Sequence, residues 1–354
     1  MEAELVVQRA LGAGARIVAL EPLKSWERSD LFRVKLEGTG VAGAILKCFK
    51  DRARGFDDWA GLAFLGGNGA PAFLGGDARE CAFLVEDLGE GRTLEAFLRG
   101  DDRRAAEDAL LELARLTGKV QAGTLGRLER YDELRDALAP RDGKVAAVAA
   151  AFLRTNVARV RAWLDAAGVT ADLDQELELV AKRVESPGPF ACFTHGDMAP
   201  SNNFFGSRGA RLLDFEWCGV RHALYDTLLW NLFCPFPEEL IARADAAYRS
   251  QLARACVAAR DDRHYERERA FVAAGRMLNL LQWLPLGVLD ADRPWAPDLT
   301  ARQALAWHLR RFHALAAPVR ELGGVAEALA GLESKLRDRW GIDAGTLVPW
   351  LALR

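Results

Sequence analysis

The sequence predicts an α+β fold with two lobes, a small β-rich lobe over residues 1–91 and a larger, mainly helical lobe over residues 92–354. Short runs with strand-like alternation, separated by polar clusters, fill residues 16–49. After residue 92 the apolar residues recur at helical spacing over long stretches. The length of 354 residues fits two domains or one domain with two lobes, and 50% hydrophobic with 27% charged residues is typical of a globular protein.

The N-terminal lobe is expected to contain five strands and one helix. Three strands at 16–23, 31–38 and 41–49 form a meander, and a helix follows at 56–65. Asp57 and Asp58 are expected near the start of that helix, where carboxylates suit the helix dipole. Two more strands follow in the segments 71–76 and 80–91. The lobe is expected to end near Phe83, with a hinge at about 84–91.

The second lobe is expected to be helical, with one interruption by strands. Helical stretches are predicted at 93–100, 103–123, 144–168 and 173–184. The apolar run at 190–194, a polar loop, and the run at 211–217 indicate two short strands beside a loop. Residues 225–354 return to helices without repeats or low-complexity segments.

Charge and composition argue against several classes of partner. With 47 basic and 50 acidic residues the net charge is −3, which lacks the cationic excess of a nucleic-acid-binding protein. No apolar run reaches the length of about 18 residues that suggests a membrane span. The six cysteines form no C-x-x-C pair and are expected to be reduced core residues. The N-terminal segment is unlike a secretory signal, so we expect a cytoplasmic protein that binds neither nucleic acid nor membrane.

One stretch carries the residue types of phosphoryl-transfer chemistry. It reads His195-Gly196-Asp197, continues to Asn202, and is followed after a short hairpin by Asp214. Phosphoryl transfer needs a carboxylate to orient the attacking hydroxyl and oxygen ligands for Mg²⁺. Asp197 would orient the hydroxyl and accept its proton, and Asn202 and Asp214 would be the metal ligands. Each residue alone is common in loops and caps, but the ordered set predicts a kinase-type site.

This pattern resembles the H-G-D-x-x-x-x-N motif, followed by a hydrophobic-D-F/W motif, of the aminoglycoside phosphotransferase and choline kinase-like family, relatives of the protein kinases. The resemblance implies a bilobal protein-kinase-like fold, ATP or alternatively GTP, and Mg²⁺. It also implies transfer of the γ-phosphoryl group to a hydroxyl of a small molecule. By position, Asp197 is the catalytic base, His195 organises the loop, and Asn202 and Asp214 bind Mg²⁺.

Lys47 is the expected phosphate-binding residue of the N-terminal lobe. Strand alternation places it on the face of Ile45 and Phe49, where a lone lysine needs an anionic partner. The resemblance implies that Lys47 binds the α and β phosphates and is held by an acid on the following helix. Asp58 stands where the family usually has Glu, and the neighbouring Asp57 is the alternative partner.

Two further nucleotide contacts are implied by the resemblance. The connection between the first two strands lacks the glycines of protein kinases, so Ser29 and nearby N–H groups would contact phosphate, although a plain hairpin turn accounts for it equally well. The hinge would hydrogen-bond the adenine edge through the main chain of Glu86 and Leu88.

The acceptor is expected to be a small molecule such as an antibiotic, a sugar or an amino alcohol. Residues 231–354 hold seventeen basic and fifteen acidic side chains, which disfavours a polycationic aminoglycoside. Tryptophans of this region either stack on an acceptor ring or fill the core; they are Trp230, Trp283, Trp295, Trp307, Trp340 and Trp350. The alternatives are a binding module without turnover, a macromolecular acceptor, or nucleotidyl transfer. A monomer or a homodimer is expected.

Overall fold

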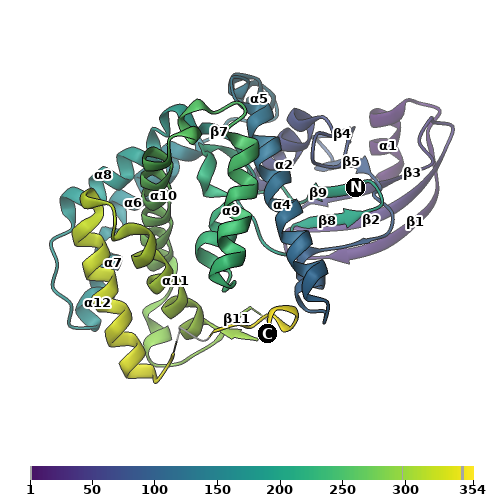
Figure 1. Ribbon diagram of the computed structural model, residues 1–354. Coiled ribbons are helices and arrows are strands. Elements are labelled where there is room, and N and C mark those ends of the chain that lie inside the picture. The colour runs from purple at the N-terminus through teal and green to yellow at the C-terminus, as the bar shows by residue number, and fades with distance from the viewer. Residues whose placement is uncertain (1, 297, 344–346) are drawn as a thin grey trace. The chain divides into compact units, whose positions relative to one another are not determined.

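The computed structural model of the protein describes residues 2–296, 298–343 and 347–354, which form two compact units (Figure 1). Unit 1 contains Met1–Leu94, Gly126–Arg141 and His195–Gly219. Unit 2 contains Glu95–Leu125, Asp142–Thr194 and Val220–Arg354. The helical part of the sequence therefore contributes two segments to unit 1. The predicted lobe boundary near residue 91 stays a prediction.

Unit 1 is built on an antiparallel five-stranded sheet with the order β1-β2-β3-β5-β4. Its strands are β1 (Arg16–Ser25), β2 (Ser29–Glu37), β3 (Gly43–Phe49), β4 (Phe73–Asp77) and β5 (Ala82–Glu86). The predicted meander and the two later strands are confirmed. In β3, Ala44 and Leu46 join the core on one face of the sheet, so the alternation turns Lys47 toward the other face.

The prediction of a single helix in this lobe was wrong, because α1 (Ala3–Leu11) precedes the sheet. Val6 and Val7 of α1 are fully buried among the core residues of β2, β3 and β5. The helix approaches β4 closely at Gly75, which has a φ of 125°. A Cβ atom on Gly75 would lie 2.9 Å from the Cα of Ala10, so this contact requires glycine.

The second helix of the unit, α2 (Arg52–Leu65), starts one turn earlier than predicted. Its N-cap is Asp51, whose side chain accepts a hydrogen bond from the Arg54 N–H at 3.2 Å. The expected position of Asp57 and Asp58 at the helix start was therefore wrong, since its first turn contains no acid. Both carboxylates are instead buried by partners outside α2.

A small three-stranded sheet with the order β6-β8-β9 completes unit 1. Its strands are β6 (Gly91–Arg92), β8 (Asn203–Gly206) and β9 (Gly209–Leu212). The strand predicted for 211–217 ends at Leu212, because Asp214 adopts the left-handed backbone conformation with a φ of 65°. The one helix wholly within the later segments of the unit is α5 (Leu128–Asp136), which packs on α2.

Unit 2 is mainly helical, as predicted. Its longer helices are α4 (Arg103–Thr124), α6 (Val145–Thr155), α7 (Val157–Ala166), α8 (Asp174–Glu185), α9 (Glu238–Leu252), α10 (Asp262–Trp283), α11 (Ala301–Ala316) and α12 (Gly323–Trp340), and the short α3 (Leu94–Leu98) precedes them. The single stretch expected at 144–168 is broken at Asn156, which ends α6 with non-helical backbone angles. Strand β7 (Ala191–Thr194) pairs with β10 (Gly219–His222), and β11 (Pro294–Ala296) pairs with β12 (Leu299–Thr300). Between these elements lie the short helices η1 (Gly188–Phe190), η2 (Ala223–Tyr225), η3 (Leu229–Phe233), η4 (Val257–Arg260), η5 (Leu286–Leu289) and η6 (Arg320–Leu322), and η8 (Leu351–Leu353) follows α12.

Helices α4 and α9 are locked together by a close contact and a buried polar network. A Cβ atom on Gly118 would lie 2.4 Å from the carbonyl oxygen of Tyr248, so the helices touch where glycine allows it. The Tyr248 hydroxyl donates to Oε1 of Gln121 at 2.5 Å, and Nε2 of Gln121 donates to Asp226 at 2.9 Å. These buried polar groups satisfy one another and fix the helix pair.

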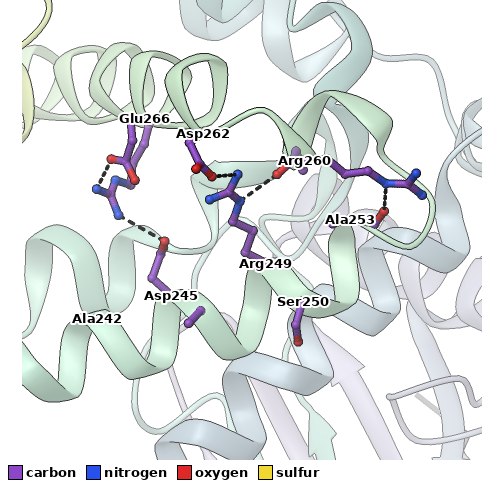
Figure 2. A pocket seen from close by; sticks show the side chains of 11 residues that line it. Ala242, Asp245, Arg249, Ser250, Ala253, Arg260, Asp262 and Glu266 are labelled. Atoms are coloured by element: carbon purple, nitrogen blue, oxygen red, sulfur yellow. Dashed lines mark hydrogen bonds and ion pairs between the residues drawn. The ribbon is translucent and has the colours of Figure 1, made fainter.

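Charged side chains join α9 to α10 around a surface cavity of about 570 Å³ (Figure 2). Arg269 pairs with Asp245 at 3.1 Å and also with Glu266, and Arg249 pairs with Asp262 at 2.6 Å. Asp245 is 7% exposed and also accepts hydrogen bonds from Asn231 and Tyr265. The charges of the cavity wall thus neutralise one another, and the network ties the two helices together.

We expect Asp245→Ala to lower the free energy of unfolding by about 3 kcal/mol, because Arg269 loses one of its two carboxylate partners and the buried donors of Asn231 and Tyr265 lose this acceptor. Denaturant unfolding would measure the loss. Asp262→Ala, in the same cavity wall, is the matched control, since Asp262 is 88% exposed and its ion pair should contribute less than about 1 kcal/mol. Equal losses of unfolding free energy in both variants would contradict the prediction that the burial of Asp245 makes its interactions more stabilising.

Within the described ranges, no helix has the length and apolarity needed to cross a membrane. All six cysteines are free thiols, as predicted. Four of them are buried and two, Cys48 and Cys81, are half-buried.

Candidate active site

The loop that follows β7 is held by His195, which is 1% exposed. Its Nε2 lies 2.7 Å from the carbonyl oxygen of Leu213, and its Nδ1 accepts the Asp197 N–H at 3.3 Å. One ring therefore links the loop to the segment just before Asp214, with the proton on Nε2. This arrangement gives His195 the means to organise the loop.

Asp197 and Asn202 face each other across this loop. Nδ2 of Asn202 donates to the carbonyl oxygen of Asp197 at 2.9 Å and to its Oδ2 at 3.1 Å. Two turns shape the loop, because the N–H of Ala199 donates to Asp197 and the N–H of Asn202 donates to Ala199. Asp197 itself is exposed and accessible to a substrate.

Sequence reasoning missed Asn203, whose side chain hydrogen-bonds to main-chain groups of the loop. It is fully buried, and its Nδ2 donates to the carbonyl oxygens of Ala199 and Pro200 at 3.2 and 3.1 Å. Its Oδ1 accepts the Leu94 N–H at 2.7 Å. The double Asn in the sequence is a signal that could have identified it, because a buried amide beside a loop commonly satisfies main-chain groups.

The chain returns to Asn202 at the end of the hairpin. The Leu213 N–H donates to the carbonyl oxygen of Asn202 at 3.0 Å, which brings the next residue, Asp214, to the same end of the hairpin. The Asp214 side chain is 39% exposed. Main-chain pairing therefore brings Asn202 and Asp214 to the same end of the hairpin although eleven residues separate them in sequence.

Three carboxylates surround the ammonium group of Lys47. Its Nζ lies 2.6 Å from Oδ2 of Asp58, 2.8 Å from Oδ1 of Asp214 and 3.1 Å from Oε1 of Glu216. Oδ1 of Asp58 accepts the Phe215 N–H at 3.0 Å, so Asp58 holds both the lysine and the segment after β9. We call Lys47, Asp58, Asp214 and Glu216 the lysine cluster.

Burial and charge act in opposite directions on the lysine cluster. Burial lowers the pKa of Lys47, but the nearby carboxylates of Asp58, Asp214 and Glu216 outweigh it and raise that pKa above its usual range. For Asp58, burial raises the pKa of the carboxyl, with Lys47 opposing and Asp214 adding to the effect. Lys47 is thus a permanent cation at the centre of a carboxylate group.

Asp57 has a different partner from Asp58. Its Oδ1 lies 2.6 Å from Nε of Arg135 on α5, and its Oδ2 lies 3.4 Å from Arg54. Neighbouring residues on a helix point about 100° apart. Asp58 therefore contacts Lys47, whereas Asp57 attaches α2 to α5.

Glu216 is a member of the site to which sequence reasoning gave no role. It is 4% exposed and also pairs with Nε of Arg28 at 2.9 Å. Arg28 lies in the turn between β1 and β2, where the sequence lacks glycine. The acid directly after the Asp214-Phe215 pair was the available signal, since a carboxylate two residues from a candidate site residue can share its site.

Ser29 lies in that same turn, at the start of β2, and is 3% exposed. Its carbonyl oxygen accepts the Trp26 N–H at 2.8 Å, which closes the turn. The phosphate contact predicted for Ser29 stays a prediction.

The predicted hinge follows β5. The Glu86 N–H donates to the carbonyl oxygen of Ala72 at 2.9 Å, and its side chain pairs with Arg208. A main-chain contact from Glu86 to a base would therefore use its carbonyl group. Leu88 is half-buried two residues later, and its predicted contact to the base stays a prediction.

Oxygen groups for a magnesium ion are available at Asn202 and Asp214. Nδ2 of Asn202 is directed at Asp197, and its Oδ1 accepts one hydrogen bond, from Oγ of Ser201 at 3.3 Å, so a second lone pair of Oδ1 is left for a cation. Lys47 contacts only Oδ1 of Asp214. Among the described residues no three His, Cys, Asp or Glu side chains are grouped to hold a metal. Two protein ligands supplemented by phosphate and water oxygens nevertheless suit Mg²⁺, so the residues present fit this ion.

Comparison with known proteins identifies the family. The model of the phosphotransferase enzyme family, APH, matches residues 62–260, more than half of the chain. The protein therefore belongs to the phosphotransferase enzyme family, which confirms the predicted family and the α+β kinase-like fold. The enzymes of this family are accordingly phosphotransferases.

Solved structures similar to the chain share little sequence identity with it. Choline kinase from Cryptosporidium parvum is 13% identical with a TM-score of 0.47, over 90% of this chain and 93% of that chain. Aminoglycoside phosphotransferase APH(2'')-Ib is 17% identical with a TM-score of 0.47, over 89% and 95%. A putative fructosamine-3-kinase from Thermobifida fusca is 16% identical with a TM-score of 0.43, over 95% and 99%. A search of curated proteins found no match.

Proposed function

We propose that the protein catalyses Mg²⁺-dependent transfer of the γ-phosphoryl group of ATP, or alternatively GTP, to a hydroxyl group of a small molecule. One observation carries this proposal. The lysine cluster and a loop in which His195 and Asn202 hold Asp197 occur together in one compact unit.

The side chains divide the work between substrate binding and proton transfer. Lys47, positioned by Asp58, binds the α and β phosphates, since a permanent ammonium suits phosphate oxygens. The carbonyl of Glu86 and the N–H of Leu88 would bind the base, and Ser29 with the neighbouring N–H groups of its turn would contact the phosphates. Asn202 and Asp214 hold Mg²⁺, which neutralises charge on the phosphates when bound.

In the proposed step the acceptor hydroxyl oxygen forms a bond to the γ phosphorus. The bond from that phosphorus to the β–γ bridging oxygen breaks, and the nucleoside diphosphate leaves. The hydroxyl proton passes to the carboxylate of Asp197. Asp197 can do this because it is exposed and because Asn202 orients its carboxylate through Oδ2.

The first test is nucleotide consumption by the purified protein with Mg²⁺ and a panel of hydroxylated antibiotics, sugars and amino alcohols. Mass detection identifies the transferred group, since a phosphoryl group adds about 80 Da and a nucleotidyl group about 329 Da. A product heavier by a phosphoryl group supports the proposal. A nucleotidylated product would overturn it, and binding of Mg·ATP without any product across the panel would favour a binding module or a macromolecular acceptor.

Asp214→Asn is expected to raise the Mg²⁺ concentration needed for half-maximal nucleotide binding by about tenfold or more, since an anionic ligand becomes neutral. Asparagine is the suitable replacement because it tolerates the left-handed backbone of Asp214. A Mg²⁺ titration of nucleotide binding measures the effect. An unchanged titration would exclude Asp214 as a metal ligand.

A further inference from the structure

Arg28 places a second cation beside the lysine cluster. It lies in the turn between β1 and β2, and its Nε lies 2.9 Å from Oε2 of Glu216. The other oxygen of that carboxylate, Oε1, lies 3.1 Å from Nζ of Lys47. All three residues belong to unit 1. Because Lys47 and Arg28 contact the two oxygens of one carboxylate, they lie close enough together for a single small anionic group to contact both.

The turn that carries Arg28 is fixed to the end of β3, the strand of Lys47. Lys50, directly after β3, donates its N–H to the carbonyl oxygen of Arg28 at 2.7 Å, and its Nζ donates to the carbonyl oxygen of Trp26 at 2.8 Å. Lys50 follows Lys47 by only three residues. The main chain of Arg28 is therefore held beside the strand that positions Lys47.

The ammonium group of Lys47 has no donor to spare for a phosphate. An ammonium carries three N–H donors and no acceptor. Nζ of Lys47 lies within 3.1 Å of three carboxylates, those of Asp58, Asp214 and Glu216. A phosphate oxygen that binds Lys47 therefore replaces one of these carboxylates.

Of the two buried carboxylates at Lys47, Glu216 is the one that can leave this lysine and stay paired with a cation. Asp58 is 1% exposed, and its other hydrogen bond comes from the neutral Phe215 N–H. Without Lys47 its charge would be buried and unpaired, which is costly. Glu216 keeps Arg28 as a partner, and its contact with Lys47 is the longest of the three.

Arg28 has donors left for a ligand. A guanidinium group carries five N–H donors in a planar fork. Within the described ranges, the side chain of Arg28 donates through Nε alone, to Glu216, and no protein group accepts a hydrogen bond from its Nη1 or Nη2. The side chain is 51% exposed, so a ligand can reach these two groups.

We propose that Arg28 binds the phosphates of the nucleotide together with Lys47. A phosphate oxygen takes the place of Oε1 of Glu216 at Lys47, and other phosphate oxygens accept hydrogen bonds from Nη1 and Nη2 of Arg28, while Glu216 stays paired with Nε. A diphosphate offers separate phosphoryl groups to the two cations, so Arg28 favours ADP and ATP over AMP. This inference rests on the proposed phosphotransferase function and adds a specificity-determining residue to its nucleotide site.

The test compares the binding of ADP and AMP to the full-length protein by calorimetry, with Mg²⁺ and again with a chelator. No acceptor is present, so the result does not depend on turnover. We expect Arg28→Gln to weaken ADP binding about tenfold and AMP binding by less than about threefold. Arg28→Lys should retain part of the ADP affinity, because it keeps the charge but not the planar fork.

The matched control is Arg9→Gln. Arg9 of α1 is 42% exposed and pairs with Asp77, whose side chain is 5% exposed, just as Arg28 pairs with the equally buried Glu216. Both variants therefore remove an exposed arginine from a buried carboxylate in unit 1. Arg9→Gln should leave the affinities for both nucleotides unchanged, and thermal unfolding of both variants would measure any shared loss of stability.

Glu216→Gln tests the competition for Lys47. Glutamine keeps the size of the side chain and an oxygen that can accept from Arg28, but it removes the negative charge. With the chelator present, we expect ADP to bind about fivefold more tightly than to the wild type, whereas a purely structural role of Glu216 predicts weaker binding.

Two results would overturn the proposal: an unchanged ratio of ADP to AMP affinity in Arg28→Gln, or weaker ADP binding to a folded Glu216→Gln variant in the presence of chelator. A wild-type protein that does not bind ADP even with Mg²⁺ would overturn both this inference and the proposed function. Failure of the proposed function alone would appear as the expected affinity changes without phosphorylation of any panel compound.

Discussion

Asp197→Asn is expected to reduce phosphoryl transfer by about 10²–10⁴-fold while nucleotide affinity stays within about twofold of wild type. The amide keeps the size of the side chain and an oxygen that can accept the hydrogen bond from Asn202. It cannot take the hydroxyl proton, so the step loses its base while the loop keeps its shape. Single-turnover phosphorylation, nucleotide binding and thermal unfolding measured on the same preparation would separate these effects.

The control for this variant is Asp101→Asn, because Asp101 is an exposed aspartate in the turn before α4. The same change of charge at this position should alter neither the rate of transfer nor nucleotide binding. Turnover at the wild-type rate in Asp197→Asn would remove Asp197 from the role of base. A loss of nucleotide affinity equal to the loss of rate would instead indicate that Asp197 acts in binding.

Lys47→Met is expected to lower the free energy of unfolding by about 3–5 kcal/mol and to abolish detectable nucleotide binding. Methionine has nearly the length of lysine but no charge, so Asp58, Asp214 and Glu216 face one another without their shared cation. Asp58 and Glu216 are at most 4% exposed, so water cannot compensate the loss for them.

The loss should depend on pH. Lys47 lowers the pKa of Asp58, so its removal raises the already elevated pKa of that carboxyl further above the ordinary value of 3.8. The folded variant then retains a proton that the unfolded chain releases, and its stability falls as pH rises above 3.8. Denaturant unfolding at pH 5 and pH 8 should therefore give a larger deficit relative to wild type at pH 8.

A second substitution tests whether charge causes the deficit. In Lys47→Met/Asp58→Asn the amide can still accept the Phe215 N–H but carries no charge, so part of the stability should return. An equal deficit at both pH values, with no recovery in the double variant, would mean that packing of the lysine stem dominates over charge.

The sequence predicted those features that depend on local periodicity. Strand alternation placed Lys47 on the face opposite Ala44 and Leu46, because the side-chain period of a strand is two. Alternation failed at the end of β9, where the positive φ of Asp214 stops the strand five residues early. The residue types of 211–217 predict a strand over the whole segment. The end of the strand at Leu212 is marked by the backbone angle of Asp214, which the residue types do not reveal.

Features that depend on partners far away in sequence could not be predicted. Asp57 and Asp58 are chemically identical. Their roles differ because Arg135, which lies 78 positions away from Asp57 in sequence, pairs with Asp57. The start of α2 was also missed, because its first turn is held by the Asp51 cap rather than by apolar residues. Likewise, no periodicity distinguishes the exposed Trp283 from the buried Trp307, since their burial depends on how the helices of unit 2 pack.

The discontinuous make-up of unit 1 has a consequence for how the chain is synthesised. Residues 1–94 emerge from the ribosome first, with Lys47 and Asp58 already present, but Asp214 and Glu216 follow only after more than a hundred further residues. Arg135, the partner of Asp57, is likewise synthesised only after residue 94. Lys47 and Asp58 can pair with each other at this stage, but the other partners of these buried charges do not yet exist, and the unit becomes complete late in translation. A fragment that ends at residue 94 should accordingly be a poor folding unit, despite having all five strands of the larger sheet.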